Sequence, residues 1–238
     1  MISAVIPVYN EAGALAEHVG VLTPILDRLA GDDWEIVLVD DGSTDGTGEA
    51  MARLTAEEPR IRGLSHDVNQ GKGAAVRTGV LASKGDAVLF CDADMSTPPE
   101  TLIPFMAALD EGADVVIGNR KSGEAVIEVW QPPLRTWLGL RFTWLANTML
   151  GLRFNDYTCG FKLFRGEAGR AIFAETEVLG WAFDVEILAR AAHRDLVVKE
   201  IPVRWHDEAD TRVKIVRDMI RSFRELLSIR RRVGRKSS

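Results

Sequence analysis

The chain has 238 residues, of which 46% are hydrophobic and 27% charged, and this composition excludes a disordered, collagen-like or coiled-coil protein. Its two cysteines, Cys91 and Cys159, exclude a disulfide-stabilised scaffold and fit a reducing compartment. The net charge of −6 is unevenly distributed, because residues 212–238 carry ten Lys or Arg against two acids (+8) and residues 1–211 therefore carry −14. The acidic body disfavours nucleic acid as a partner, whereas the basic tail suits an anionic surface.

The first half of the chain alternates short apolar runs with stretches of helical periodicity. We expect strands at residues 2–8, 34–39, 61–65, 87–91 and 115–118, and helices between them at 12–30, 47–57, 72–82 and 99–111. This alternation predicts an α/β fold with a mostly parallel, Rossmann-like sheet and helices on both faces. Ligands of such sheets bind beyond the carboxyl ends of the strands, where this sequence is polar, glycine-rich or acidic.

After residue 120 the pattern changes. An apolar helix is expected at 134–152, a second helix at 183–193, a strand at 196–205 and a basic helix from about Arg212. No apolar run reaches the ~18 residues of a membrane-spanning helix, and the first residues lack the basic segment of a signal peptide. We therefore expect a cytoplasmic body with a separate basic tail at 212–238.

Two acidic pairs follow predicted strands. The adjacent carboxylates Asp40 and Asp41 require a ligand or hydrogen-bond donors at a buried strand end, whereas the nearby Asp45 is better explained as a helix cap. Strand alternation points Asp92 and Asp94 the same way, which predicts an oxygen site for Mg²⁺ or Mn²⁺ shared with substrate phosphates. A calcium loop starting at Asp41 is disfavoured, because its twelfth position is Ala52 rather than Glu.

Residues 69–73, Asn-Gln-Gly-Lys-Gly, begin a predicted helix whose amides could face a phosphate or a sugar oxygen; a plain turn is the alternative. The segment is not a P-loop, because His66 stands where glycine is required. No Gly-x-Ser-x-Gly or His-Glu-x-x-His pattern occurs, so the common serine-hydrolase and zinc-protease sites are disfavoured. We expect the histidines to be satisfied surface or loop residues.

These motifs, in this order, resemble those of the GT-A fold family 2 glycosyltransferases. The resemblance is carried by Val-Ile-Pro-Val-Tyr-Asn-Glu at 5–11, Asp-Asp-Gly-Ser-Thr-Asp at 40–45 and Asp-Ala-Asp at 92–94. Later motifs at 69–77, 118–120, 158–164 and 181–186 resemble the dolichyl- or polyprenyl-phosphate glucosyltransferases, which are relatives of the dolichyl-phosphate mannose synthases. The resemblance implies a GT-A domain at 1–211, with a nucleotide-binding half at about 1–120 and an acceptor half at about 120–211.

The resemblance also implies roles for individual residues on the donor side. The positions assigned to the nucleotide are Pro7, Tyr9, Glu11, Asp40, Asp41, Gly71, Lys72, Asp92 and Ala93. The metal, Mg²⁺ or Mn²⁺, is assigned to Asp92 and Asp94. Ser96 replaces the glutamine that supplies a third metal ligand in the mannose synthases, so this chain departs from their pattern.

On the acceptor side, Arg120 is assigned to the acceptor phosphate, and Arg212 and Lys214 are expected to close over the phosphates. Trp181 and Asp184 are assigned to the sugar, with core packing as the alternative for Trp181. The candidate catalytic residues are Asp94, Arg120 and Asp184.

The implied reaction is the inverting transfer of a hexose from a UDP-sugar, with glucose favoured, to a polyprenyl or dolichyl phosphate. Since a phosphate acceptor needs no general base, Asp184 is expected to position the sugar or organise the metal. The alternatives are a GDP-mannose-dependent mannosyltransferase and a non-catalytic membrane-binding module on a transferase-like fold. A sugar-nucleotide pyrophosphorylase is a weaker alternative, because residues 7–11 are not its glycine-rich, arginine-containing loop.

Two segments are expected to dock the protein on the cytosolic face of an anionic membrane without crossing it. Between the arginines of the tail, apolar residues recur at helical spacing, a pattern typical of interfacial helices; they are Ile215, Val216, Met219, Ile220, Phe223, Leu226 and Leu227. In the second segment Trp130, Trp137 and Trp144 lie seven residues apart, and tryptophan favours membrane interfaces. For both segments the alternative is packing against the protein's own sheet.

Overall fold

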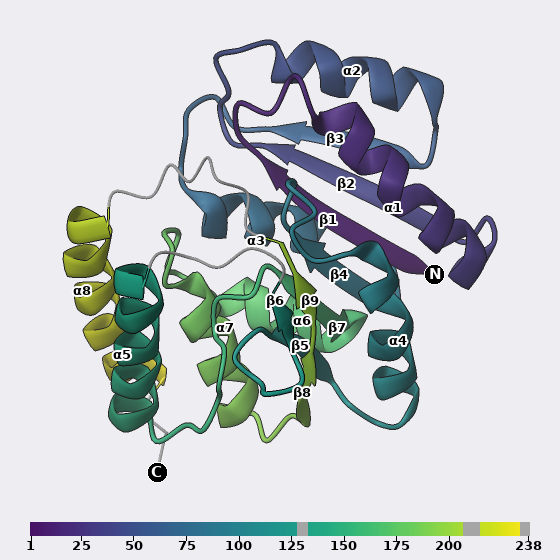
Figure 1. Cartoon of the computed structure of the whole chain (residues 1–238). Helices are drawn as coiled ribbons and strands as arrows, with labels where there is room; N and C mark the ends of the chain where they lie inside the picture. The colour runs from purple at the N-terminus through teal and green to yellow at the C-terminus, as the bar shows by residue number, and fades with distance from the viewer. Residues whose placement is uncertain (128–132, 207–214, 234–238) are drawn as a thin grey trace.

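The computed structural model describes residues 1–127, 133–206 and 215–233 of the chain (Figure 1). Its helices and strands follow in this order: β1 (Ile2–Val8), α1 (Leu15–Ala30), β2 (Trp34–Asp40), α2 (Thr47–Glu57), β3 (Ile61–Ser65), α3 (Lys72–Ala82), β4 (Ala87–Cys91), the 3₁₀ turn η1 (Pro99–Thr101), α4 (Leu102–Asp110), β5 (Val115–Asn119), β6 (Val126–Ile127), α5 (Pro133–Leu150), β7 (Phe161–Arg165), α6 (Gly166–Glu175), α7 (Phe183–His193), β8 (Val198–Pro202), β9 (Arg204–Trp205) and α8 (Ile215–Val233).

A seven-stranded sheet with the order β3-β2-β1-β4-β7-β5-β8 forms the centre of the molecule. β7 runs antiparallel to β4 and β5, and the other neighbouring strands are parallel. The predicted mostly parallel α/β sheet is thus confirmed, with β7 as a strand that the sequence did not predict. β1 lies between β2 and β4, so the strand order reverses there, and the carboxyl ends of these strands border the usual ligand crevice.

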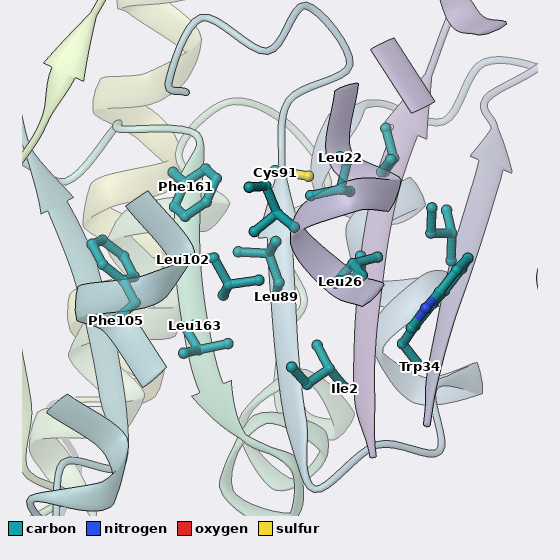
Figure 2. Packing of buried hydrophobic residues seen from close by; sticks show 14 of the residues in the cluster. Ile2, Leu22, Leu26, Trp34, Leu89, Cys91, Leu102, Phe105, Phe161 and Leu163 are labelled. Carbon is teal, nitrogen blue, oxygen red and sulfur yellow. The ribbon is translucent and has the colours of Figure 1, made fainter. Parts of the chain in front are cut away.

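Helices cover both faces of the sheet, as predicted (Figure 1). On one face Leu22 and Leu26 of α1 and Phe105 of α4 pack against Leu89 and Leu163 of the sheet (Figure 2). On the other face α3, α6 and α7 cover a second cluster, which includes Phe90, Phe164, Phe173 and Phe183. Neighbouring residues of one strand enter different clusters, because side chains alternate across a strand that is buried on both faces.

Two predicted boundaries differ from the structure. α1 begins at Leu15 rather than at residue 12, because the preceding segment makes a turn in which Glu11 accepts the backbone amides of Ala14 and Leu15. The strand predicted at 196–205 divides into β8, in the large sheet, and β9, which pairs with β6 in a separate two-stranded sheet. The division follows Pro202, which has no amide hydrogen to continue a ladder.

α5 and α8 lie side by side at the edge of the molecule opposite α1 and α2 (Figure 1). In α8 the side chains of Leu226, Ile229 and Val233 are buried in the cluster that also contains α7. The side of α8 that carries these three residues therefore packs on the protein. For this part of the tail the structure supports the alternative of packing on the protein's own core over membrane docking. Within the described part of the chain, no helix combines the length and apolarity needed to cross a membrane.

Other residues predicted to dock lie outside this description. Trp130, Arg212 and Lys214 fall in segments that the structure does not describe. The same holds for the side chains of Ile215, Val216, Met219, Ile220 and Phe223.

Candidate active site

The loops after β1 and β2 hold each other at the carboxyl edge of the sheet. Asn10 adopts a left-handed conformation (φ 56°), its amide donates to Ser43 Oγ at 2.9 Å, and its Oδ1 accepts the Thr44 amide at 2.8 Å. The Glu11 amide donates to Thr47 Oγ1 at 2.8 Å. Asp45 Oδ1 accepts the amide of Thr47, the first residue of α2, at 3.0 Å, although Gly46 rather than Asp45 is the N-cap; Asp45 thus holds the helix start from the position before the cap. These bonds fix the segment that contains Pro7, Tyr9 and Glu11 beside the end of β2.

Asp40 and Asp41 both receive the donors that their burial requires. Asp40 Oδ1 accepts the Ser43 amide at 3.0 Å. Asp41, only 3% exposed, accepts the amides of Gln70 and Gly71 at 2.9 and 2.8 Å, and its Oδ1 lies 2.8 Å from His66 Nδ1. Asp41 therefore ties the loop before α3 to the end of β2, and His66 is a satisfied loop residue, as expected.

The expectation that the amides of residues 69–73 face a phosphate is wrong for three of them. The Gln70 and Gly71 amides are bound to Asp41, and the Gly73 amide donates to the Leu179 carbonyl at 2.9 Å. Gly71 has φ 106°, and an added Cβ would overlap the Leu179 carbonyl. The glycines thus allow the loop to pack closely against the segment that precedes Trp181, and these three bonds favour the alternative of a helix-start turn.

Asp92 and Asp94 follow β4, beside the switch point. Asp92 Oδ1 is buried, and the Nζ of Lys72 lies 2.6 Å from it. The Asp92 amide donates to the Gly160 carbonyl at 2.9 Å, and a Cβ at Gly160 would overlap the Asp92 carboxylate. Asp94 Oδ1 accepts the Ser96 amide at 2.9 Å. The structure thus holds two carboxylates at one strand end, with the first of them oriented by a close backbone contact.

This pair fits a hard divalent cation that draws further oxygen ligands from its substrate, as Mg²⁺ commonly does. The described residues contain no group of three or more His, Cys, Asp or Glu side chains placed to hold a metal. Among the described residues, Asp92 and Asp94 are thus the candidate ligands, and a bound diphosphate and water could supply further oxygen atoms.

Lys72 lies at the start of α3 and joins several of the candidate residues. Its Nζ lies 5.1 Å from the ring centre of Trp181 and 5.5 Å from that of Phe90, as well as against Asp92. Burial alone would lower the pKa of Lys72, but the carboxylates of Asp92, Asp184 and Asp94 raise it above the ordinary value. The ammonium is therefore charged at neutral pH. Trp181 is 47% exposed, so its indole covers Lys72 and remains open to a ligand.

Asp184, in the first turn of α7, forms a buried ion pair that the sequence analysis missed. Its Oδ1 lies 2.6 Å from the Nζ of Lys162, which is fully buried in β7. Burial raises the pKa of Asp184, and the ammonium groups of Lys162 and Lys72 oppose this effect. The one signal in the sequence is a lysine within the apolar run Phe-Lys-Leu-Phe at 161–164.

Arg120 follows β5, at the same edge of the sheet, and forms an ion pair with Asp156. Its Nε and Nη2 donate to the two oxygens of Asp156 at 2.7 and 2.9 Å, and Nη2 also donates to Thr158 Oγ1 at 2.9 Å. Asp156 is fully buried; the charge of Arg120 outweighs burial and lowers its pKa. The bidentate fork that we expected to meet an acceptor phosphate is thus occupied by Asp156.

Lys121 lies beside this pair. Its Nζ donates to Thr143 Oγ1 of α5 at 2.7 Å and lies 3.9 Å from Asp156. Burial, and to a smaller degree the neighbouring Arg120, lower the pKa of Lys121. The sequence analysis gave Lys121 no role, because the closeness of α5 could not be foreseen from the chain.

The candidate residues therefore form two groups at the carboxyl edge. The loops after β1, β2 and β4, with the start of α3, hold the nucleotide and metal candidates, including the buried Ala93. The start of α7 adds Trp181 and Asp184 to them through Lys72. Arg120 and Lys121 form the second group, between β5 and α5. Arg212 and Lys214 lie outside the described residues, so their predicted closing role stays a prediction.

Comparison with known proteins relates this geometry to a family. The chain matches the family model described as "Glycosyl transferase family 2" over residues 3–173. It is 37% identical over 222 residues to a dolichyl-phosphate beta-glucosyltransferase of Trichomonas vaginalis, covering 89% of this chain and 65% of that protein. It is 34% identical over 249 residues to the dolichyl-phosphate beta-glucosyltransferase of Saccharomyces cerevisiae, covering 96% of this chain and 74% of that protein. The chain thus spans less than two thirds of the Trichomonas relative's length.

Solved structures share the fold. Glucosyl-3-phosphoglycerate synthase from Mycobacterium tuberculosis, in complex with Mn²⁺, UDP-glucose and phosphoglyceric acid, aligns with a TM-score of 0.70 and 20% sequence identity. The alignment covers 100% of this chain and 81% of that one. At 20% identity this similarity shows a common fold and does not identify the substrate of this chain.

Proposed function

The chain belongs to glycosyl transferase family 2, and from this membership and the geometry of its strand ends we propose that it transfers glucose from UDP-glucose to a polyprenyl or dolichyl phosphate. The observation that carries the proposal is the pair Asp92 and Asp94 at the switch point, with Lys72 and Trp181 against it. The names of the Trichomonas and yeast relatives support glucose and a dolichyl-phosphate acceptor. The complex of the mycobacterial synthase with UDP-glucose and Mn²⁺ supports the donor and the cation.

On the donor side, the protein has to stabilise the negative charge that develops on the departing UDP. Asp92 and Asp94 would hold the divalent ion, which when bound stabilises charge on the departing UDP. Lys72 lies close enough to Asp92 to share that task, and the Trp181 indole offers a flat surface to the sugar. Asp184, which is buried and feels the charge of Lys72, would position the sugar. The loops that Asp41 and Asn10 hold together form the wall of the nucleoside pocket.

The acceptor supplies its own nucleophile. A phosphate oxygen of the lipid attacks C1 of glucose, while the bond from C1 to the diphosphate breaks and its electron pair leaves with UDP. No proton has to be removed from an ionised phosphate, so no general base is needed. Direct displacement inverts C1, so an α-linked donor gives a β-linked lipid phosphate. Arg120, oriented by Asp156, and Lys121 provide positive charge on the acceptor side.

The acceptor is a lipid, and the exposed face of α5 suits docking on the cytosolic face of a membrane. Trp137, Leu140 and Trp144 are 52, 50 and 61% exposed and lie on one side of the helix. Tryptophan favours the membrane interface, and Arg141 beside Trp137 can pair with anionic headgroups. Thr143, on the buried side of the same helix, accepts a hydrogen bond from Lys121, so α5 lies between the exposed face and the proposed acceptor side. The basic tail at 212–238 adds attraction to the same surface.

Incubation of the protein with polyprenyl phosphate, Mn²⁺ and a panel of UDP- and GDP-sugars tests the function. We expect a glucosylated lipid from UDP-glucose, and no product when a chelator removes the metal. Product from GDP-mannose alone would instead identify a mannosyltransferase. Failure to use any sugar nucleotide, with binding to vesicles retained, would support the non-catalytic membrane module.

Co-sedimentation with vesicles that contain an anionic lipid tests the docking face separately. The variant Trp137→Ser/Trp144→Ser should bind several-fold less than the wild type, because it removes the two exposed indoles. Val21→Ser is the matched control, since Val21 is 47% exposed on the distant helix α1. Equal binding of all three proteins would exclude α5 as the docking face.

A further inference from the structure

Lys162 is a fully buried lysine in the middle of the central sheet. It pairs in register with Phe90 of β4 and Ile117 of β5, and its strand neighbours Phe161 and Leu163 are buried apolar residues. Its Nζ donates to Asp184 Oδ1 and to the Cys159 carbonyl, each at 2.6 Å. The ammonium also lies 5.7 Å from the ring centre of Phe90.

A buried ion pair such as this one is weak evidence for a stabilising role. Burying an ammonium and a carboxylate together costs about as much as their attraction returns, and apolar replacements of both are often neutral or stabilising. The surrounding cluster contains phenylalanines and branched aliphatic residues that would accept such a replacement. A function that uses the carboxylate explains the pair better than packing does.

The position of Asp184 indicates that function. It follows Trp181 by three residues, and both Lys72 and Asp92 influence its ionisation. Lys72 in turn lies against Asp92 and the Trp181 ring. Charges thus alternate from Lys162 through Asp184 and Lys72 to Asp92, and Lys162 occupies the end of this series that is buried in the sheet.

We propose that Lys162 is a positioning residue, which holds the Asp184 carboxylate in the orientation needed to bind the hexose of the donor. The inference rests on the proposed function, in which Asp184 meets the sugar. Lys162 itself need not touch the donor. Its carbonyl partner Cys159 and its place in β7 fix the ammonium, and Asp184 is fixed through it. Without Lys162 the carboxylate would lose the contact that fixes its orientation.

Binding of UDP and of UDP-glucose, each measured by calorimetry with Mn²⁺, tests the inference without any turnover. In Lys162→Met the dissociation constant for UDP-glucose should rise about 10- to 100-fold, which is the loss expected for a hydrogen bond to a charged group. The constant for UDP should stay within about threefold of the wild-type value, since UDP lacks the sugar. Asp184→Asn should show the same selective loss.

The double variant Lys162→Met/Asp184→Asn separates positioning from folding. It removes both charges and so should fold even if Lys162→Met does not. Its affinity for UDP-glucose should equal that of Asp184→Asn, because Lys162 acts through Asp184. Arg190→Met is the matched control: it breaks the buried pair with Glu186 on the same helix α7, should lower thermal stability, and should keep wild-type affinity for UDP-glucose.

Three results would overturn the inference. The first is wild-type affinity of Lys162→Met for UDP-glucose, and the second is an equal loss for UDP and UDP-glucose. The third is a double variant whose affinity for UDP-glucose is lower than that of Asp184→Asn by the same factor that Lys162→Met alone causes. Failure of the proposed function would give a different result. A wild-type protein that binds UDP-glucose but glucosylates no lipid phosphate would still show the selective loss of UDP-glucose affinity in Lys162→Met.

Discussion

Replacing Gly160 by alanine should displace the carboxylate of Asp92, the proposed metal ligand, and leave the fold intact. Gly160 precedes β7, and an added Cβ would overlap Cγ and Oδ2 of Asp92 and lie 2.7 Å from Oδ1. An ordinary contact starts near 3.4 Å, so even Oδ1 must retreat by about 0.7 Å and Oδ2 by more. The bond from the Asp92 amide to the Gly160 carbonyl keeps the two backbones together, so the side chain has to move.

The expected loss follows from this displacement. Misplacing a reacting or coordinating group by about 1 Å can cost about 100-fold in rate, and altered support of a metal ligand costs about 10- to 100-fold in metal affinity. We therefore expect Gly160→Ala to bind Mn²⁺ at least about tenfold more weakly in the presence of UDP. Its kcat/KM for glucosyl transfer should fall about 100-fold.

Mn²⁺ titration followed by electron paramagnetic resonance measures the affinity, and urea unfolding checks the fold. Gly20→Ala in α1 is the matched control, because its Cβ meets nothing within 4 Å, and it should keep both Mn²⁺ affinity and activity. Wild-type Mn²⁺ affinity and kcat/KM in Gly160→Ala would refute the assignment of Asp92 to the metal.

Substitutions at three further residues test the two halves of the proposed site. Asp94→Asn should remove most turnover and weaken Mn²⁺ binding with unchanged thermal stability; normal activity in the presence of a chelator would contradict the metal assignment. Asp156→Asn should lower the free energy of unfolding by about 3–5 kcal/mol at pH 7, because it leaves Arg120 without its buried partner. Arg120 holds the folded pKa of Asp156 below its unfolded value of about 3.9, so this contribution is present above that pH and lost as the pH falls further; urea unfolding at pH 7 and pH 3 should therefore differ less in the variant than in the wild type. Arg120→Ala should raise KM for the lipid phosphate more than KM for UDP-glucose. Arg120→Lys should restore little activity, because an ammonium cannot donate to Asp156 through two fixed N–H groups. Lost UDP-glucose affinity with unchanged lipid kinetics would instead assign Arg120 to the donor side.

The elements of the first half of the chain could be predicted from local pattern alone. α3 and β4 have the predicted bounds, because Gly71 marks the start of the helix and buried apolar residues fill the strand. The acidic strand ends were likewise predictable, since a carboxylate directly after a buried strand must lie at the edge of the sheet.

The partners of those polar groups were not predictable, because they come from distant parts of the chain. Asp156 lies 36 residues from Arg120, and Asp184 lies 22 residues from Lys162. β7 was missed for the same reason: its alternation is hidden by apolar residues on both faces, and only its neighbours β4 and β5 define it as an antiparallel strand. The sequence shows where polar groups gather, and the tertiary contacts decide which of them remain available to a ligand.

Asp41 and Asp92 lie at the same edge of the sheet, but different kinds of group hold their carboxylates. The carboxylate of Asp41 accepts the backbone amides of Gln70 and Gly71, which hold the loop before α3 beside the proposed nucleoside pocket. The carboxylate of Asp92 is held by the ammonium of Lys72, a long side chain that can move to an incoming phosphate. A backbone amide cannot be exchanged for a ligand without unfolding the loop, whereas a lysine can. We therefore propose that the donor recruits Asp92, whose carboxylate a lysine holds, and that Asp41 acts through the loop that its two amide bonds hold.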